Sequence, residues 1–114
     1  MRSEVQWTAL QRAVETELPF PPPYQFKCFG YPPHPDPFDA DVDYWGDWSD
    51  ACLRPFEQLE WLRVRPRYLK HRGRLVAPEV VDIEREFVML LERLTVPYER
   101  DGEAIVITVP HRSE

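Results

Sequence analysis

Two stretches of the chain carry apolar residues at helical spacing. In residues 3–18 they recur every three or four positions, at Trp7, Leu10, Val14 and Leu18. This spacing predicts a helix with one buried face, ended by Pro19. A wider stripe comprises Val80, Ile83, Phe87, Leu90, Leu91 and Leu94. Pro78 suits the first turn of a helix, and Glu79 and Asp82 suit the positive end of its dipole, so we predict that a second helix opens at Pro78.

Alternating apolar and polar positions predict strands elsewhere. The candidates are residues 24–29, 59–65, 96–100 and 103–109. Asp101 and Gly102 separate the last two, which is the signal of a type I′ hairpin. In the last strand, Ile105, Ile107 and Val109 alternate with other apolar side chains, which predicts burial on both faces. Ser49 suits the cap of a short helix that Pro55 must end, and residues 71–74 suggest a turn before a short apolar piece at residues 75–76.

These elements predict an α+β fold. Their order is α-β-loop-β-α-β-β, with no internal repeat and no domain boundary, so residues 1–114 are expected to form one domain. A small antiparallel sheet with both helices on one face is the simplest two-layer arrangement.

Residues 31–48 form a long predicted loop with four prolines, here called the acidic loop. A loop of this length is unusual in so small a domain and is typical of functional segments. Residues 36–50 hold six Asp and no Lys or Arg, and the whole chain has a formal net charge of −6. Acidic charge beside large aromatic rings favours binding to a basic partner surface. The predicted contact residues are Asp39, Asp41, Asp43, Tyr44, Trp45, Asp47 and Trp48.

Residues 63–74 hold six basic residues and no acid. Arg63, Arg65, Arg67 and Lys70 are candidates either for binding an external anion or for internal pairing with the acidic loop. With Tyr68 and Trp61 as stacking rings, the segment could bind RNA or a phosphate ligand, but the net charge argues against nucleic acid.

Catalytic and metal motifs are mostly missing from the sequence. Asp39, Asp41 and Asp43 have the spacing of a calcium loop, but Tyr44 stands where that loop needs Gly, and Asp50 where it needs Glu. The three histidines are scattered, and no nucleophile or phosphate-loop motif occurs. We therefore expect no cofactor, no metal site, no catalytic residue and no enzymatic activity. A small metal-dependent enzyme on the acidic loop remains an alternative.

The cellular setting is also predicted from composition. Cys28 and Cys52 are expected to be reduced thiols, since two cysteines do not make a disulfide framework. No apolar run suggests a signal peptide or a membrane span, so we expect a cytoplasmic protein that does not bind membranes.

Three segments carry a resemblance to known proteins: residues 18–24 (LPFPPPY), 44–50 (YWGDWSD) and 65–75 (RPRYLKHRGRL). They resemble a small bacterial family associated with immunity to polymorphic toxins, over roughly residues 5–108 of this sequence. The resemblance implies a single-domain antitoxin that occludes its cognate toxin domain, and it carries over no catalytic residue.

Overall fold

The computed structural model describes residues 4–53 and 56–108. Over these residues the helices are α1 (Glu4–Glu17), α2 (Asp50–Leu53), the short 3₁₀ helix η1 (Phe56–Gln58) and α3 (Glu84–Arg93). The strands are β1 (Tyr24–Cys28), β2 (Leu59–Val64), β3 (Arg67–Lys70), β4 (Glu79–Asp82), β5 (Glu99–Asp101) and β6 (Ala104–Thr108). Residue 3, the predicted start of the first helix, lies outside the described residues, as do Pro55 and Val109.

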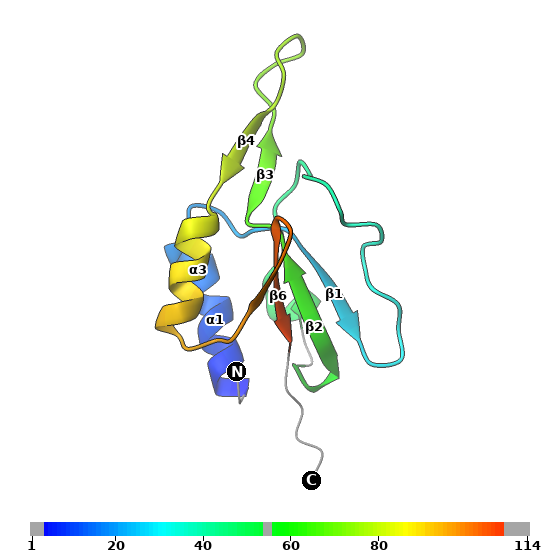
Figure 1. Ribbon diagram of the computed structural model, residues 1–114, viewed down its shortest axis with the longest axis vertical. Helices are drawn as coiled ribbons and strands as arrows, with labels where there is room; N and C mark the ends of the chain where they lie inside the picture. The colour runs from blue at the N-terminus through cyan, green and yellow to red at the C-terminus, as the bar shows by residue number, and fades with distance from the viewer. Residues whose placement is uncertain (1–3, 54–55, 109–114) are drawn as a thin grey trace.

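Four strands form one antiparallel sheet in the order β1-β2-β6-β5. In its centre Leu62 pairs with Ile107 and Val64 with Ile105, and all four side chains are fully buried. Helices α1 and α3 lie together on one side of this sheet (Figure 1). Their apolar stripes join the strand residues in one core, which includes Trp7 and Phe87. The predicted α+β class with helices on one face of an antiparallel sheet is confirmed.

The second helix begins later than predicted. Residues 79–82 form strand β4, which pairs with β3, and helix α3 starts only at Glu84. Both ends of this hairpin match opposite charges, Arg67 with Asp82 and Lys70 with Glu79. Asp82 then accepts a hydrogen bond from the backbone N–H of Glu84 at 2.8 Å. The acids expected at the helix dipole are therefore strand residues. Val80, the first residue of the predicted stripe, is an exposed residue of β4, and the stripe's core residues come from α3.

The β3–β4 hairpin projects away from the helices and the main sheet (Figure 1). The predicted apolar piece at its tip is exposed, because Leu75 is 99% and Val76 49% accessible.

Two predictions at the chain's last strands also need correction. The β5–β6 turn consists of Gly102 and Glu103, because Asp101 already pairs with Ala104. Gly102 has a φ of 61°, a conformation that favours glycine. Strand β6 is fully buried on one face only, since Val106 is half-buried and Thr108 is exposed.

Candidate functional site

The acidic loop first runs back along the open edge of β1. Backbone hydrogen bonds of 2.9 Å join Phe26 and His34 in both directions. Gln25 donates from its side chain to the carbonyl oxygen of Pro35 at 2.7 Å, and Arg63 to that of Phe38 at 2.7 Å. Phe38 itself is only 3% exposed. The loop therefore covers a strand edge that would otherwise present unpaired backbone groups.

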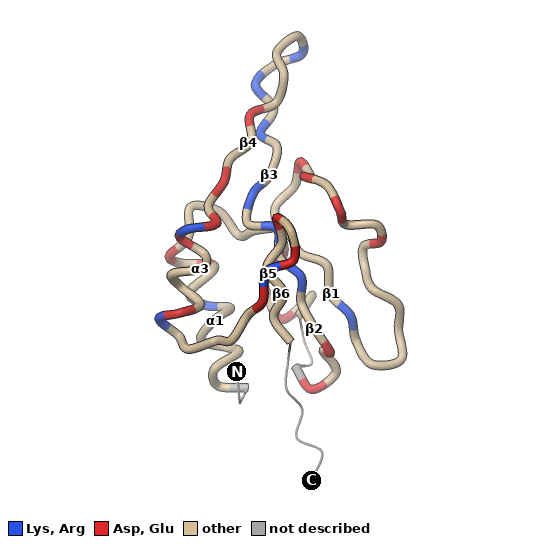
Figure 2. The backbone as a smooth tube through the Cα atoms, viewed as in Figure 1, with Lys and Arg blue, Asp and Glu red and all other residues tan. Residues whose placement is uncertain are grey.

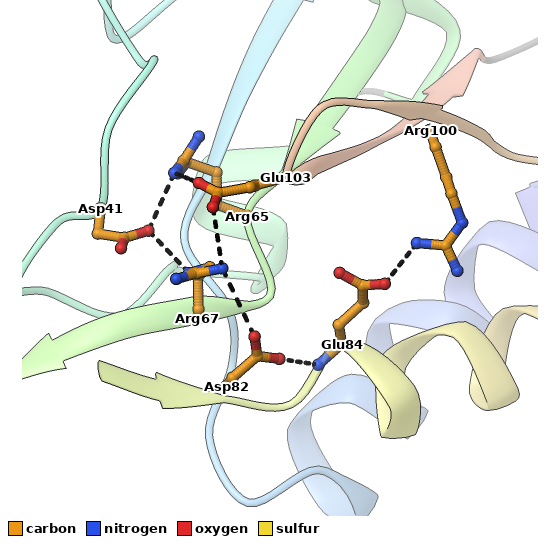
Figure 3. A network of polar contacts seen from close by, with 7 residues as sticks. All are labelled: Asp41, Arg65, Arg67, Asp82, Glu84, Arg100 and Glu103. Atoms are coloured by element: carbon orange, nitrogen blue, oxygen red, sulfur yellow. Dashed lines mark hydrogen bonds and ion pairs between the residues drawn. The ribbon is translucent and has the colours of Figure 1, made fainter. Parts of the chain in front are cut away.

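An arginine pair holds the middle of the acidic loop. Asp41 Oδ1 lies 2.9 Å from Arg65 Nη2 and 3.0 Å from Arg67 Nε (Figure 3). Glu103 lies 3.0 Å from Arg65 and 3.4 Å from Arg67, and Asp82 lies 3.6 Å from Arg67. Arg65 is only 4% exposed. Because a buried guanidinium needs compensating charge, this network fixes the loop to β3, β4 and the β5–β6 turn.

The remaining members of the basic set differ from one another. Arg63 Nε pairs with Asp101 at 3.1 Å, so Arg63, Arg65 and Arg67 all have internal carboxylate partners. Lys70 is exposed near the end of the hairpin. Figure 2 shows the consequence: basic residues lie along β3 and the projecting tip, with the loop's carboxylates beside the base of the hairpin.

The aromatic residues of the acidic loop separate into two environments. Trp48 is 1% exposed, and its indole N–H donates to the carbonyl oxygen of Pro22 at 2.8 Å. Its ring meets those of Tyr24 and Phe87 edge-on, at 5.5 and 6.1 Å between centroids. The sequence predicts Trp48 as a contact residue, and the structure corrects this: Trp48 is buried in the core, because the loop turns inward to reach Phe87 of α3.

Trp45 and Tyr44 stay at the surface, 53% and 45% exposed. The ring of Trp45 stacks on buried Phe20 at 6.0 Å between centroids and meets Tyr68 edge-on at 5.9 Å. Trp45 is thus supported from two other segments while half of its surface faces outward. Sequence reasoning missed Phe20 and Tyr68 as supports, although both lie within the segments that carry the resemblance.

Gly46 is required between the two tryptophans. Its N–H donates to the carbonyl oxygen of Pro21 at 3.0 Å. A Cβ at this position would lie 2.3 Å from the backbone oxygen of Pro22 and 2.9 Å from the ring of Tyr24. The close approach of the loop to the proline segment therefore depends on glycine.

The predicted carboxylates also differ in their surroundings. Asp39, Asp43 and Asp47 are exposed, whereas the Asp41 side chain is only 18% accessible. A hydrogen bond with His71 at 3.1 Å lowers the pKa of Asp43. Hydrogen bonds from Ser49, and a weaker one from the Cys52 thiol, lower the pKa of Asp47. Both groups are therefore anionic at neutral pH.

A pocket of about 520 Å³ lies between β1, the acidic loop and α2. The described residues that line it are Tyr24, Phe26, His34, Pro35, Tyr44, Trp45, Gly46, Asp47, Ala51 and Cys52. The Tyr24 hydroxyl donates to the backbone oxygen of Asp47, and burial, with Cys52 and Asp47 nearby, raises the pKa of Tyr24. Sequence reasoning placed Tyr44, Trp45 and Asp47 in a contact surface but did not foresee that β1 completes a pocket with them.

Residues 4–53 and 56–108 offer neither a metal cluster nor a membrane-spanning helix. No three of their His, Cys, Asp or Glu side chains gather closely enough to hold a metal ion. None of the helices in this part of the chain has the length and apolar character needed to cross a membrane. Both Cys28 and Cys52 are free thiols.

The chain is an α+β domain in which an acidic, aromatic loop is held in place beside a four-stranded sheet. Residues 1–111 match the family described as "Family of unknown function (DUF6678)", and the protein belongs to that family. Comparisons with curated proteins and with solved structures find no match.

Proposed function

We propose that this protein is a non-catalytic binding module that captures the basic surface of a partner protein through its acidic loop. One observation carries the proposal. Hydrogen bonds, ion pairs and buried side chains hold the loop against the domain, yet Asp39, Asp43, Tyr44 and Trp45 remain exposed. A surface held in place before binding loses little conformational entropy when a partner arrives. Its carboxylates speed the encounter, and its rings supply apolar area that holds the complex.

The partner to test first is a toxin domain. The resemblance of three segments to toxin-immunity proteins motivates this choice, and an acidic surface suits a toxin whose active site is basic because it acts on nucleic acid. Such an immunity protein would act in the cytoplasm, where its two thiols stay reduced. The gene adjoining that of this protein is then expected to encode a large secreted protein with a variable C-terminal domain.

The alternative of an RNA-binding or phosphate-binding module is supported less well. An external anion would have to displace Asp41 and Glu103 from Arg65 and Arg67. It would also approach a molecule whose net charge is −6.

The experiment measures association and dissociation with the toxin domain encoded by the adjoining gene. We expect the double variant Asp39→Asn and Asp43→Asn to associate about tenfold more slowly at low salt, with a flatter salt dependence. Asp41 is left unchanged, because it also neutralises the buried Arg65. The control variant, Glu15→Gln with Glu86→Gln, removes the same charge from exposed positions on α1 and α3.

A second variant tests the aromatic half of the proposal. Trp45→Ala is expected to raise the dissociation rate at least tenfold, because a half-exposed ring on a rigid support is typical of a binding hot spot. Tyr31→Ala, also exposed but at the other end of the loop, is the control. Absence of binding at micromolar concentrations, or equal rates for the loop variants and their controls, would refute the proposal.

A further inference from the structure

We propose that the pocket between β1 and the acidic loop receives an arginine side chain of the partner. The inference deepens the proposed function and rests on it for the identity of the ligand as part of a protein. The proposed function says only that an acidic surface attracts a basic partner, whereas this inference names the pocket in which one basic side chain of the partner binds.

The pocket is lined by aromatic rings from two segments. Tyr24 and Phe26 come from β1, with ring centroids 6.1 Å apart, and Tyr24 is only 7% exposed. Tyr44 and Trp45 come from the loop and are about half exposed. The buried ring therefore belongs to the floor and the exposed rings to the rim. A volume of about 520 Å³ falls within the range of pockets that bind small ligands.

The charges at this pocket favour a cation. Asp47 lies in its lining, with a carboxylate that hydrogen bonds from Ser49 and Cys52 keep ionised. None of the described lining residues is Lys or Arg. The negative faces of aromatic rings attract a cation, and a carboxylate at the rim adds a charge-assisted hydrogen bond.

Arginine fits this lining better than lysine for a geometric reason. Its guanidinium is planar, stacks on ring faces and is less strongly hydrated than an ammonium group. The same group can donate at its edge to the Asp47 carboxylate while its face lies against a ring. A compact ammonium ion offers no plane to stack and loses more hydration on entering an aromatic pocket.

The test uses the isolated protein and a small probe. N-acetylarginine amide is titrated, with its neutral isostere N-acetylcitrulline amide and with N-acetyllysine amide in parallel, while NMR follows the Trp45 indole and the Tyr24 ring. A ligand of this size is expected to bind with a Kd on the order of 1 mM. We expect saturable shifts at these rings with the arginine probe, weaker binding of the lysine probe and none of the citrulline probe.

Variants separate the pocket from general electrostatic attraction. Tyr44→Leu and Asp47→Asn should each raise the Kd of the arginine probe about three- to fivefold, whereas Tyr44→Phe, which keeps the ring, should not. Two exposed residues outside the pocket lining, changed as Tyr31→Leu and Asp36→Asn, serve as controls. Equal binding of the citrulline probe, tighter binding of the lysine probe, or the same loss in the control variants would overturn the inference.

The two proposals fail in different ways. Binding of the arginine probe without capture of any toxin domain would refute the immunity function and leave the pocket assignment standing. Capture of the toxin domain by a protein that does not bind the probe would do the reverse.

Discussion

The acidic loop and the β3–β4 hairpin lie side by side, and the loop, which has no regular secondary structure, is held to the rest of the protein more closely than the tip of the regular hairpin is. The loop forms no strand of its own over residues 31–48, yet Phe38 and Trp48 within it are buried and Asp41 is paired with two arginines. The hairpin has four regular cross-strand pairs, yet residues 71–78 at its tip are exposed. What fixes a segment here is tertiary contact, made by its side chains and by its backbone, rather than regular secondary structure.

The comparison also separates two kinds of surface charge. The carboxylates of the acidic loop are carried by a backbone that is hydrogen-bonded to Phe26 of β1, to Leu69 of β3 and to Pro21 in the proline-rich segment 19–23. At the hairpin tip, Arg72 instead bonds within the tip, donating to the carbonyl oxygen of Ala77 at 3.1 Å, and His71 reaches the loop only through an exposed hydrogen bond to Asp43. A fixed surface is suited to selective binding, because its geometry exists before the partner arrives.

The largest expected effect comes from removing the loop's core anchor. Trp48→Ala deletes a fully buried indole between Tyr24 and Phe87, and it should lower the free energy of unfolding by about 3–5 kcal/mol. Urea denaturation followed by circular dichroism measures it. The matched change in the hairpin, Leu75→Ala at 99% exposure, should alter stability by less than about 0.5 kcal/mol. Similar losses from both variants would mean that the hairpin tip is not independent of the core.

Trp48 also marks the limit of what could be predicted from the sequence. Helix α1, the body of α3, the positions of β1 and β2 and the presence of a last hairpin follow from local spacing, because each element buries one face at its own period. Trp45 and Trp48 are three residues apart in the same Asp- and aromatic-rich segment, yet Trp45 is half exposed and Trp48 is buried. The difference depends on the Pro22 carbonyl and the Phe87 ring, which come from distant parts of the chain.

The start of α3 illustrates the same limit. Pro78, Glu79 and Asp82 have the pattern of a helix opening, and only the register of residues 79–82 against β3 makes them a strand. Internal pairing of the arginines was one of two open alternatives, because charge balance alone does not say where a carboxylate lies. Glu103, which pairs with Arg65, is close to it only after β6 joins β2.

The next effect tests how closely the loop is held. Gly46→Ala would place a methyl group against the Pro22 oxygen, and because backbone cannot yield easily, we expect a loss of about 2–3 kcal/mol. The hairpin glycine, Gly73, has a φ of 140°, which strains any residue with a side chain, but a Cβ there would meet only the Val76 side chain at 4.0 Å. Gly73→Ala should therefore cost about 1–2 kcal/mol, less than Gly46→Ala. Thermal unfolding of both variants measures the two losses of stability, and a larger loss in Gly73→Ala than in Gly46→Ala would contradict this prediction.

A smaller loss is expected when the arginine pair is broken. Arg65→Met leaves Asp41 with Arg67 alone and should cost about 2 kcal/mol, less than a fully buried pair, because Glu103 is 59% accessible. The amide of Leu69, which donates to Val42 of the loop at 2.7 Å, should also exchange faster with solvent. Arg72→Met at the tip should change neither quantity. Unchanged Leu69 exchange in Arg65→Met would show that the pair does not hold the loop.

The smallest effect at neutral pH comes from Tyr24→Phe, which removes one hydrogen bond to the Asp47 carbonyl and should cost about 1 kcal/mol. Its larger signature lies at high pH. Burial raises the pKa of Tyr24 in the folded protein, so above the unfolded value near 10 the unfolded chain loses this proton first, and stability falls as pH rises. One proton sets the limit of that slope at about 1.4 kcal/mol per pH unit. Tyr24→Phe should therefore flatten the dependence of unfolding free energy on pH between about 10 and 11, whereas a wild-type slope in the variant would mean that the acidic loop does not shield this hydroxyl.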